Sequence, residues 1–249
     1  MNAVCLTFSW LTVLPITGPA AVDRHAAGQA IALAPLVGLV LGGLATAAMW
    51  LSVTAGLTTL LAGLLTVGAL GLLTRGMHLD GLADTVDGLG SYGPPERARQ
   101  IMKSGGAGPF GVAALIFAIA VQAVAFAALA DEGHWFALGL AVTLGRVAVV
   151  PACRRGLAAA PDSGFGTLVA GTQSPGAVVG WPVLAVLAAV FAVPGNFWLG
   201  PAVVLAVLAL CALIVRHCVR RFDGLSGDVL GAVVEITVSL AAVGFSLTG

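Results

Sequence analysis

Three aspartates, Asp80, Asp84 and Asp87, fall close together in a chain that has only eleven acidic residues. On a helix each residue turns by about 100°, so these side chains share an arc of roughly 60° and follow each other at about 6 Å and then about 4.5 Å. Carboxylates at that spacing repel one another unless some are protonated or a cation lies between them. Oxygen ligands of this kind suit Mg²⁺, Mn²⁺ or Ca²⁺. The alternative is a solvated acidic face, which fits less well in a chain so poor in charge.

A second pair of acids, Asp228 and Glu235, lies near the C-terminus. Seven residues separate them, so they lie about 20° apart on one helical face. Glu235 sits about two turns inside an apolar run, where an ionisable residue is costly and is a functional-site hypothesis by default. The alternative is a Glu235 near the membrane interface that is hydrogen-bonded within the helix bundle. Gly227 and Gly231 would let another helix or a ligand approach this backbone.

Basic residues near these acids would suit a polyanionic substrate. For any exposed one, the alternative is the ordinary anchoring of a membrane protein by positive charges. Arg146 differs because it lies inside an apolar run and therefore needs a carboxylate or a phosphate as partner. The residues that we expect to contact substrate are Arg75, Arg97, Lys103, Arg146, Ser226 and Gly227.

The composition places these residues in a membrane protein. Of the 249 residues, 59% are hydrophobic and only 9% are charged, whereas a soluble domain carries about 25% charged residues. The mean hydropathy is +1.05. The long apolar runs lack the alternation of a membrane barrel and are rich in small residues, which lets membrane helices pack closely. We therefore predict an all-α, polytopic bundle that forms one domain over residues 1–249.

The apolar runs predict about seven transmembrane helices, together with a short N-terminal apolar helix over 4–15 and an acidic cytoplasmic helix that follows the second span. The first fifteen residues lack a basic start and a cleavage site, so we do not interpret them as a signal peptide. The four cysteines show no metal-binding spacing and are expected to be buried free thiols. The expected spans are 29–53, 57–74, 106–130, 135–153, 178–194, 199–215 and 229–247.

The distribution of charge predicts the orientation. All eleven Lys and Arg lie in or next to four segments, 16–28, 75–105, 146–155 and 216–221, and two spans separate each segment from the next. The turns near 54, 131 and 195 contain no Lys or Arg. Because basic loops stay in the cytoplasm, we predict a multi-pass protein of the cytoplasmic (inner) membrane whose acidic cluster faces the cytoplasm.

Several short motifs follow one another along nearly the whole chain. The most specific is His78-Leu-Asp80-Gly-Leu-Ala-Asp84-Thr-Val-Asp87-Gly, followed in specificity by Ser226-Gly-Asp228-Val-Leu-Gly231-Ala-Val-Val-Glu235. The shorter ones are Leu14-Pro15, Pro35-Leu-Val-Gly38 and Ile101-Met-Lys103 to Gly108-Pro-Phe-Gly111. Together these motifs resemble the cobalamin synthase (adenosylcobinamide-GDP ribazoletransferase) family. The family often has Asp-Ser-Arg after the lysine, where this chain has Ser104-Gly-Gly106, so no role is carried over to a basic residue there.

The resemblance implies a phosphotransferase for substituted phosphate groups that acts late in cobalamin (vitamin B12) biosynthesis. Adenosylcobinamide-GDP would give its cobinamide-phosphoryl group to the ribose 5′ hydroxyl of α-ribazole or of α-ribazole 5′-phosphate. GMP would leave, adenosylcobalamin or its phosphate would form, and Mg²⁺ would be required, with Mn²⁺ as an alternative. The bilayer is a further partner, and a second copy of the chain or other cobalamin-assembly enzymes are candidates; no nucleic acid is expected.

Displacement at phosphorus needs the diphosphate charge neutralised and the attacking hydroxyl activated. One carboxylate not fully engaged by metal would act as general base. His78 is the second candidate base, but on a regular helix it points away from the acidic face. We therefore expect His78, like Glu235, to contact the residues of the site rather than the metal itself. The expected catalytic residues are Asp80, Asp84 and Asp87, and the expected metal ligands are these three and Asp228.

Two other functions compete with this one. A CDP-alcohol phosphotransferase of phospholipid synthesis also uses an aspartate-rich helix, but its pattern needs Ala-Arg where this chain has Asp84-Thr85. A secondary transporter would use the aspartates and Glu235 as ion sites. It should show interrupted helices in two related halves, and no such repeat is visible.

Overall fold

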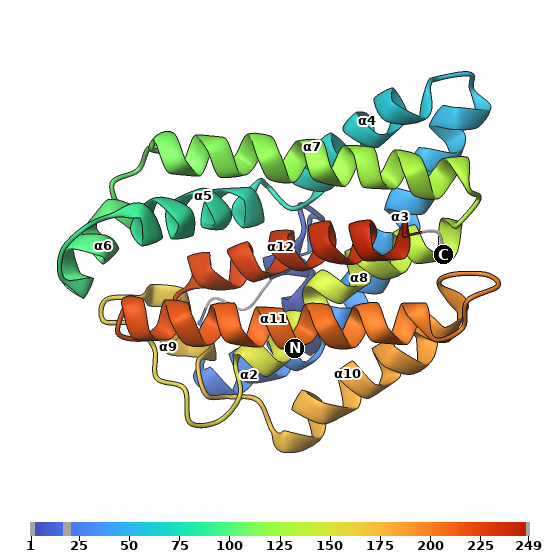
Figure 1. Cartoon of the computed structure of the whole chain (residues 1–249). Coiled ribbons are helices and arrows are strands. Elements are labelled where there is room, and N and C mark those ends of the chain that lie inside the picture. The colour runs from blue at the N-terminus through green and yellow to red at the C-terminus, as the bar shows by residue number, and fades with distance from the viewer. Residues whose placement is uncertain (1–2, 17–20, 248–249) are drawn as a thin grey trace.

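The computed structural model describes residues 3–16 and 21–247. That part of the chain is helical, with two isolated bridges and no strands (Figure 1). The elements are α1 (Ala3–Leu11), α2 (Arg24–Ala32), α3 (Ala34–Thr54), α4 (Thr59–Leu73), α5 (Met77–Gly90), α6 (Pro95–Met102), α7 (Pro109–Asp131), α8 (Trp135–Ala152), α9 (Gly164–Val169), α10 (Pro175–Ala188), the 3₁₀ turn η1 (Ala189–Phe191), α11 (Leu199–Arg221) and α12 (Gly227–Phe245).

Five of the described helices, α3, α7, α8, α11 and α12, are long and apolar enough to cross a membrane. A sixth span results if α4 and α5, which meet at an angle of 93°, are taken together. The seventh expected span corresponds to the shorter apolar stretch Pro175–Phe191. The membrane class and the all-α fold are thus confirmed, whereas the count of seven is not.

Two boundaries predicted from the sequence are wrong. The expected span 29–53 is divided at Leu33 into α2 and α3, because Pro35 in the first turn of α3 starts a new helix. The expected span 199–215 is part of a helix that continues to Arg221, since α11 extends past its apolar part with basic residues in its last turn, where positive charge is favourable. The short N-terminal helix and the acidic helix are present as α1 and α5.

The C-terminal helix α12 lies in the middle of the bundle and packs against α5, α7, α8 and α11. The N-terminal ends of α7 and α12 and the C-terminal ends of α5 and α11 lie together at one end of the molecule, on the left in Figure 1. The α3–α4, α7–α8 and α10–α11 connections lie toward the other end. The basic and acidic segments are therefore gathered at one end of the bundle, as their distribution in the sequence predicts.

The bend between α4 and α5 sets the position of the acidic helix. It uses two consecutive residues with positive φ, Arg75 (56°) and Gly76 (68°), and the second of these suits glycine because it has no Cβ. The Arg75 guanidinium then donates to the main-chain carbonyls of Ser9 and Trp10, at 3.0 and 3.1 Å. This contact fastens the start of α5 to the C-terminal end of α1, where carbonyls lack partners within the helix.

The arrangement predicts which turns lie outside the cytoplasm. Reporter fusions at Gly133 and Gly195 should be read as extracytoplasmic, because both lie in turns without Lys or Arg. Fusions at Gly90 and Gly164 should be read as cytoplasmic. A paired alkaline phosphatase and fluorescent-protein reporter at each position makes the measurement, and a cytoplasmic signal at Gly133 would contradict this topology.

Candidate functional site

The helices α5 and α12 touch at the acidic cluster. A Cβ atom added to Gly81 would lie 2.7 Å from the main-chain oxygen of Asp228 and 3.0 Å from its Cα. One turn further along, a Cβ on Gly231 would lie 3.2 Å from the Cα of His78. Glycine at both positions therefore permits the backbones to approach. A metal site shared by Asp228 and the aspartates of α5, as expected from the sequence, requires these two helices to be neighbours, and the structure confirms that they are.

Asp80 and Asp228 line the same cavity, which has a volume of about 240 Å³ and extends between α5, α8 and α12. Asp80 is exposed and Asp228 is half-buried. A second cavity of about 170 Å³ adjoins the first, since Phe165, Gly227 and Asp228 line both. Asp228 thus stands where the two cavities meet.

The second cavity holds three of the residues expected to contact substrate. Ser226, Gly227 and Lys103 all line it. Ser226 caps α12, since its hydroxyl accepts from the Val229 amide at 3.3 Å, and the Lys103 ammonium donates to the carbonyl of Asp162 at 3.0 Å. This cavity combines a positive charge with a helix N-terminus, which is a favourable setting for an anion.

Asp84 lies one turn after Asp80 on α5 and is half-buried. Burial first, and then the negative charges of Asp80, Asp228 and Asp87, raises the pKa of Asp84 from its usual 3.8 to about 6. The acids of α5 and α12 therefore act on one another through space, as carboxylates do when no opposite charge separates them. A divalent cation would remove this repulsion, so the charge and the oxygen-only chemistry of these side chains fit a hard cation.

Asp87 differs from the other acids of α5. Its carboxylate oxygens accept hydrogen bonds from the main-chain amides of Gly108, at 2.6 Å, and Gly111, at 2.9 Å, and the residue is only 8% exposed. These amides belong to the start of α7, where they lack partners within the helix. Asp87 thus anchors α7 to α5, and its oxygens are engaged by the main chain rather than turned toward Asp228.

The side-chain positions do not form a closed metal centre. Within residues 3–16 and 21–247, no group of three His, Cys, Asp or Glu side chains is close enough to hold a metal ion. What the fold brings together is the pair Asp80 and Asp228 on one cavity wall, with Asp84 beside them in electrostatic contact.

Arg146 is buried and contacts a side chain of α5. Its guanidinium is 4% exposed and lies 3.4 Å from Nδ1 of His78, while its Nε has no hydrogen-bond partner. No ion pair within 4.0 Å joins Arg146 to Glu235 in the described part of the chain. Glu235 instead accepts from Nε2 of Gln122 at 2.8 Å. The charges of Arg146 and Glu235 still act on each other, so Glu235 is a carboxylate near Arg146 that makes no direct ion pair with it.

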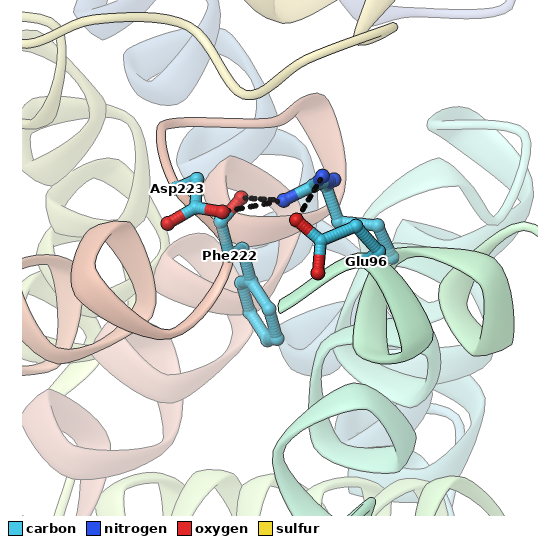
Figure 2. Close-up of polar contacts among 4 residues, drawn as sticks. Glu96, Phe222 and Asp223 are labelled. Atoms are coloured by element: carbon cyan, nitrogen blue, oxygen red, sulfur yellow. Dashed lines mark hydrogen bonds and ion pairs between the residues drawn. The ribbon is translucent and has the colours of Figure 1, made fainter. Parts of the chain in front are cut away.

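The remaining basic residues divide between anchoring and exposure. Arg75 is used to hold α1, and Arg97 is exposed on α6. Arg99 joins α6 to the end of α11. It donates to the Phe222 carbonyl at 3.1 Å and to Asp223 at 3.0 Å, and it lies 3.6 Å from Glu96 (Figure 2). Its partner segment is more than a hundred residues away in the chain, so no local spacing could have shown this role.

Comparison with known proteins shows the family of this chain. A family model described as cobalamin-5-phosphate synthase matches residues 3–246. An adenosylcobinamide-GDP ribazoletransferase of Nocardioides sp. is 40% identical over 230 residues, covering 92% of this chain and 91% of the relative. A protein of the same name from Corynebacterium efficiens is 37% identical, covering 97% and 90%. No solved structure matches the chain. The chain belongs to the cobalamin-5-phosphate synthase family.

Proposed function

We propose that this protein is an adenosylcobinamide-GDP ribazoletransferase. It transfers the cobinamide-phosphoryl group of adenosylcobinamide-GDP to the 5′ hydroxyl of α-ribazole, or of α-ribazole 5′-phosphate, and releases GMP. The observation that carries the proposal is the match to one family over residues 3–246, because it includes both acidic segments that the fold places in contact. The active site is then the polar end of the bundle, facing the cytoplasm of the inner membrane.

Mg²⁺, or Mn²⁺ in its place, would be held by Asp80, Asp84 and Asp228. Asp80 and Asp228 line the same cavity, and the charges of both act on Asp84 at the contact of α5 and α12. When bound, such a cation supplies charge neutralisation on the diphosphate. Asp87 is left out of this ligand set because its oxygens hold the start of α7.

The chain's own residues bind the donor and move the proton. Lys103 and the N-terminus of α12 line the smaller cavity, where they can hold the phosphate oxygens of the donor. A carboxylate oxygen of the acidic cluster that does not contact the cation accepts the proton of the attacking hydroxyl. His78 is not needed for this step, because its Nδ1 faces Arg146.

The proposal is tested with purified protein in detergent or nanodiscs, incubated with GDP-cobinamide, α-ribazole and Mg²⁺. We expect GMP and a cobalamin product in equal amounts, and neither when α-ribazole is omitted. Chelation should stop the reaction and added Mg²⁺ should restore it. Absence of GMP from folded protein, or transfer from a CDP-alcohol donor instead, would overturn the assignment.

A further inference from the structure

The larger of the two adjoining cavities has a mostly apolar lining. Its volume of about 240 Å³ exceeds that of a buried cavity of about 150 Å³, which is enough to bind a benzene ring. Its walls come from six helices, and its polar side chains are those of His78, Asp80 and Asp228. The apolar walls include Leu11 of α1, Ile31 of α2, Val149 of α8, Phe165 of α9, and Leu230 and Val234 of α12.

We propose that this cavity is the acceptor site, in which the flat apolar ring system of the acceptor enters between α8 and α12 while its sugar hydroxyls face Asp80 and Asp228. The inference rests on the proposed function, and adds to it the place and the chemistry of the acceptor. An apolar cavity with a few convergent polar groups is the usual form of a site for a small molecule that is partly hydrophobic.

The charges of the two cavities separate acceptor from donor. The larger cavity has no Lys or Arg among its lining residues, whereas Arg99 and Lys103 both line the smaller one. A diphosphate needs cationic partners, so the smaller cavity suits the donor and the larger one suits a ring without charge. Asp228 lies on the boundary, which places the reacting groups of both substrates beside the acidic cluster.

His78 provides a fixed hydrogen-bond donor to this cavity. A guanidinium has only N–H donors, so the 3.4 Å contact with Arg146 makes Nδ1 of His78 the acceptor. The proton of the neutral ring then resides on Nε2, which makes no hydrogen bond to another residue of the described chain. His78 is only 6% exposed and lines the cavity. A donor at that place can bind an oxygen or nitrogen atom of the acceptor and orient its ring.

Filling the cavity tests the proposal. Val234→Phe places a ring in the cavity from α12, because Val234 lines it and is 1% exposed. We expect the KM for α-ribazole to rise at least about tenfold, while the KM for adenosylcobinamide-GDP stays within about twofold. Val243→Phe is the matched control: it is the same substitution on the same helix at a position 40% exposed, and should change neither KM.

A second substitution covers the case in which Val234→Phe does not fold. Val149→Ala, on α8, enlarges the cavity and should raise the KM for α-ribazole about fivefold without changing that of the donor. His78→Leu removes the donor and should do the same, whereas His78→Gln keeps an N–H group near the Nε2 position and should largely restore binding.

The outcomes separate this inference from the proposed function. Equilibrium dialysis of the wild type with α-ribazole alone measures acceptor binding without turnover. If the wild type forms no GMP, the proposed function fails. If the wild type forms GMP, two results would place the acceptor site elsewhere. In one, the Val234→Phe and Val149→Ala proteins keep the wild-type KM for α-ribazole and its wild-type dissociation constant from dialysis. In the other, both variants lose affinity for donor and acceptor equally.

Discussion

Replacing Asp84 by asparagine should reduce turnover to less than a hundredth of the wild-type rate, which corresponds to at least about 2.7 kcal/mol in the barrier. The substitution keeps the size of the side chain but removes the charge that we assign to cation binding. It also removes a carboxylate with a raised pKa of about 6, which results from burial and from the neighbouring acids. Release of GMP at saturating Mg²⁺ and at tenfold lower Mg²⁺ gives the measurement, and the variant should need more Mg²⁺ than the wild type.

Glu235→Gln is the matched control for Asp84→Asn, because it makes the same acid-to-amide change on the neighbouring helix α12. Its side chain contacts Gln122 rather than the acidic cluster, so it should lose less activity. Thermal unfolding provides the folding control. Ionisation of Asp84 is disfavoured in the folded state, so asparagine there should leave the melting temperature unchanged or raise it. If the Asp84→Asn protein keeps more than a tenth of the wild-type activity, its activation free energy has risen by less than about 1.4 kcal/mol, and Asp84 is not a metal ligand.

Replacing Gly81 by alanine should have the second large effect. The added Cβ would lie 2.7 Å from the Asp228 oxygen, and backbone atoms cannot yield as a flexible side chain does. The helices α5 and α12 must therefore move apart, which changes the separation of their carboxylates. We expect at least about a hundredfold loss of kcat, together with a decrease of about 1–3 kcal/mol in the free energy of unfolding.

Gly68→Ala is the control for this change. It lies on the preceding helix α4, and no atom lies within 4 Å of the Cβ that it would add. The same substitution there should leave GMP release within about twofold of the wild type, since it adds a methyl group in open space. A Gly81→Ala enzyme that retains half of its activity would show that the close approach of α5 and α12 is not required for the reaction.

The amino-acid sequence alone determined the membrane class, the helix that carries Asp80 and Asp84, and the gathering of charge at one end. Each of these depends on local properties, namely hydropathy over a span, a spacing of three to four residues and the distribution of Lys and Arg. The contact between the two acidic helices was predicted less directly, from the assignment of the α5 aspartates to one metal site with Asp228. It was confirmed by the approach of Gly81 to that residue.

Only the tertiary structure decided where the individual side chains act. Asp87 has the same spacing and the same helical face as Asp84, yet its oxygens bind the amides that begin α7, and Arg146 meets His78 rather than Glu235. The apolar cavity beside Asp80 draws walls from α1, α2 and α9, none of which the sequence marked as part of the site. The physical reason is that spacing along the sequence determines only the face of a helix on which a residue lies. Which residues that face contacts depends on where neighbouring helices cross it. Those crossings result from packing between segments that are far apart in the chain.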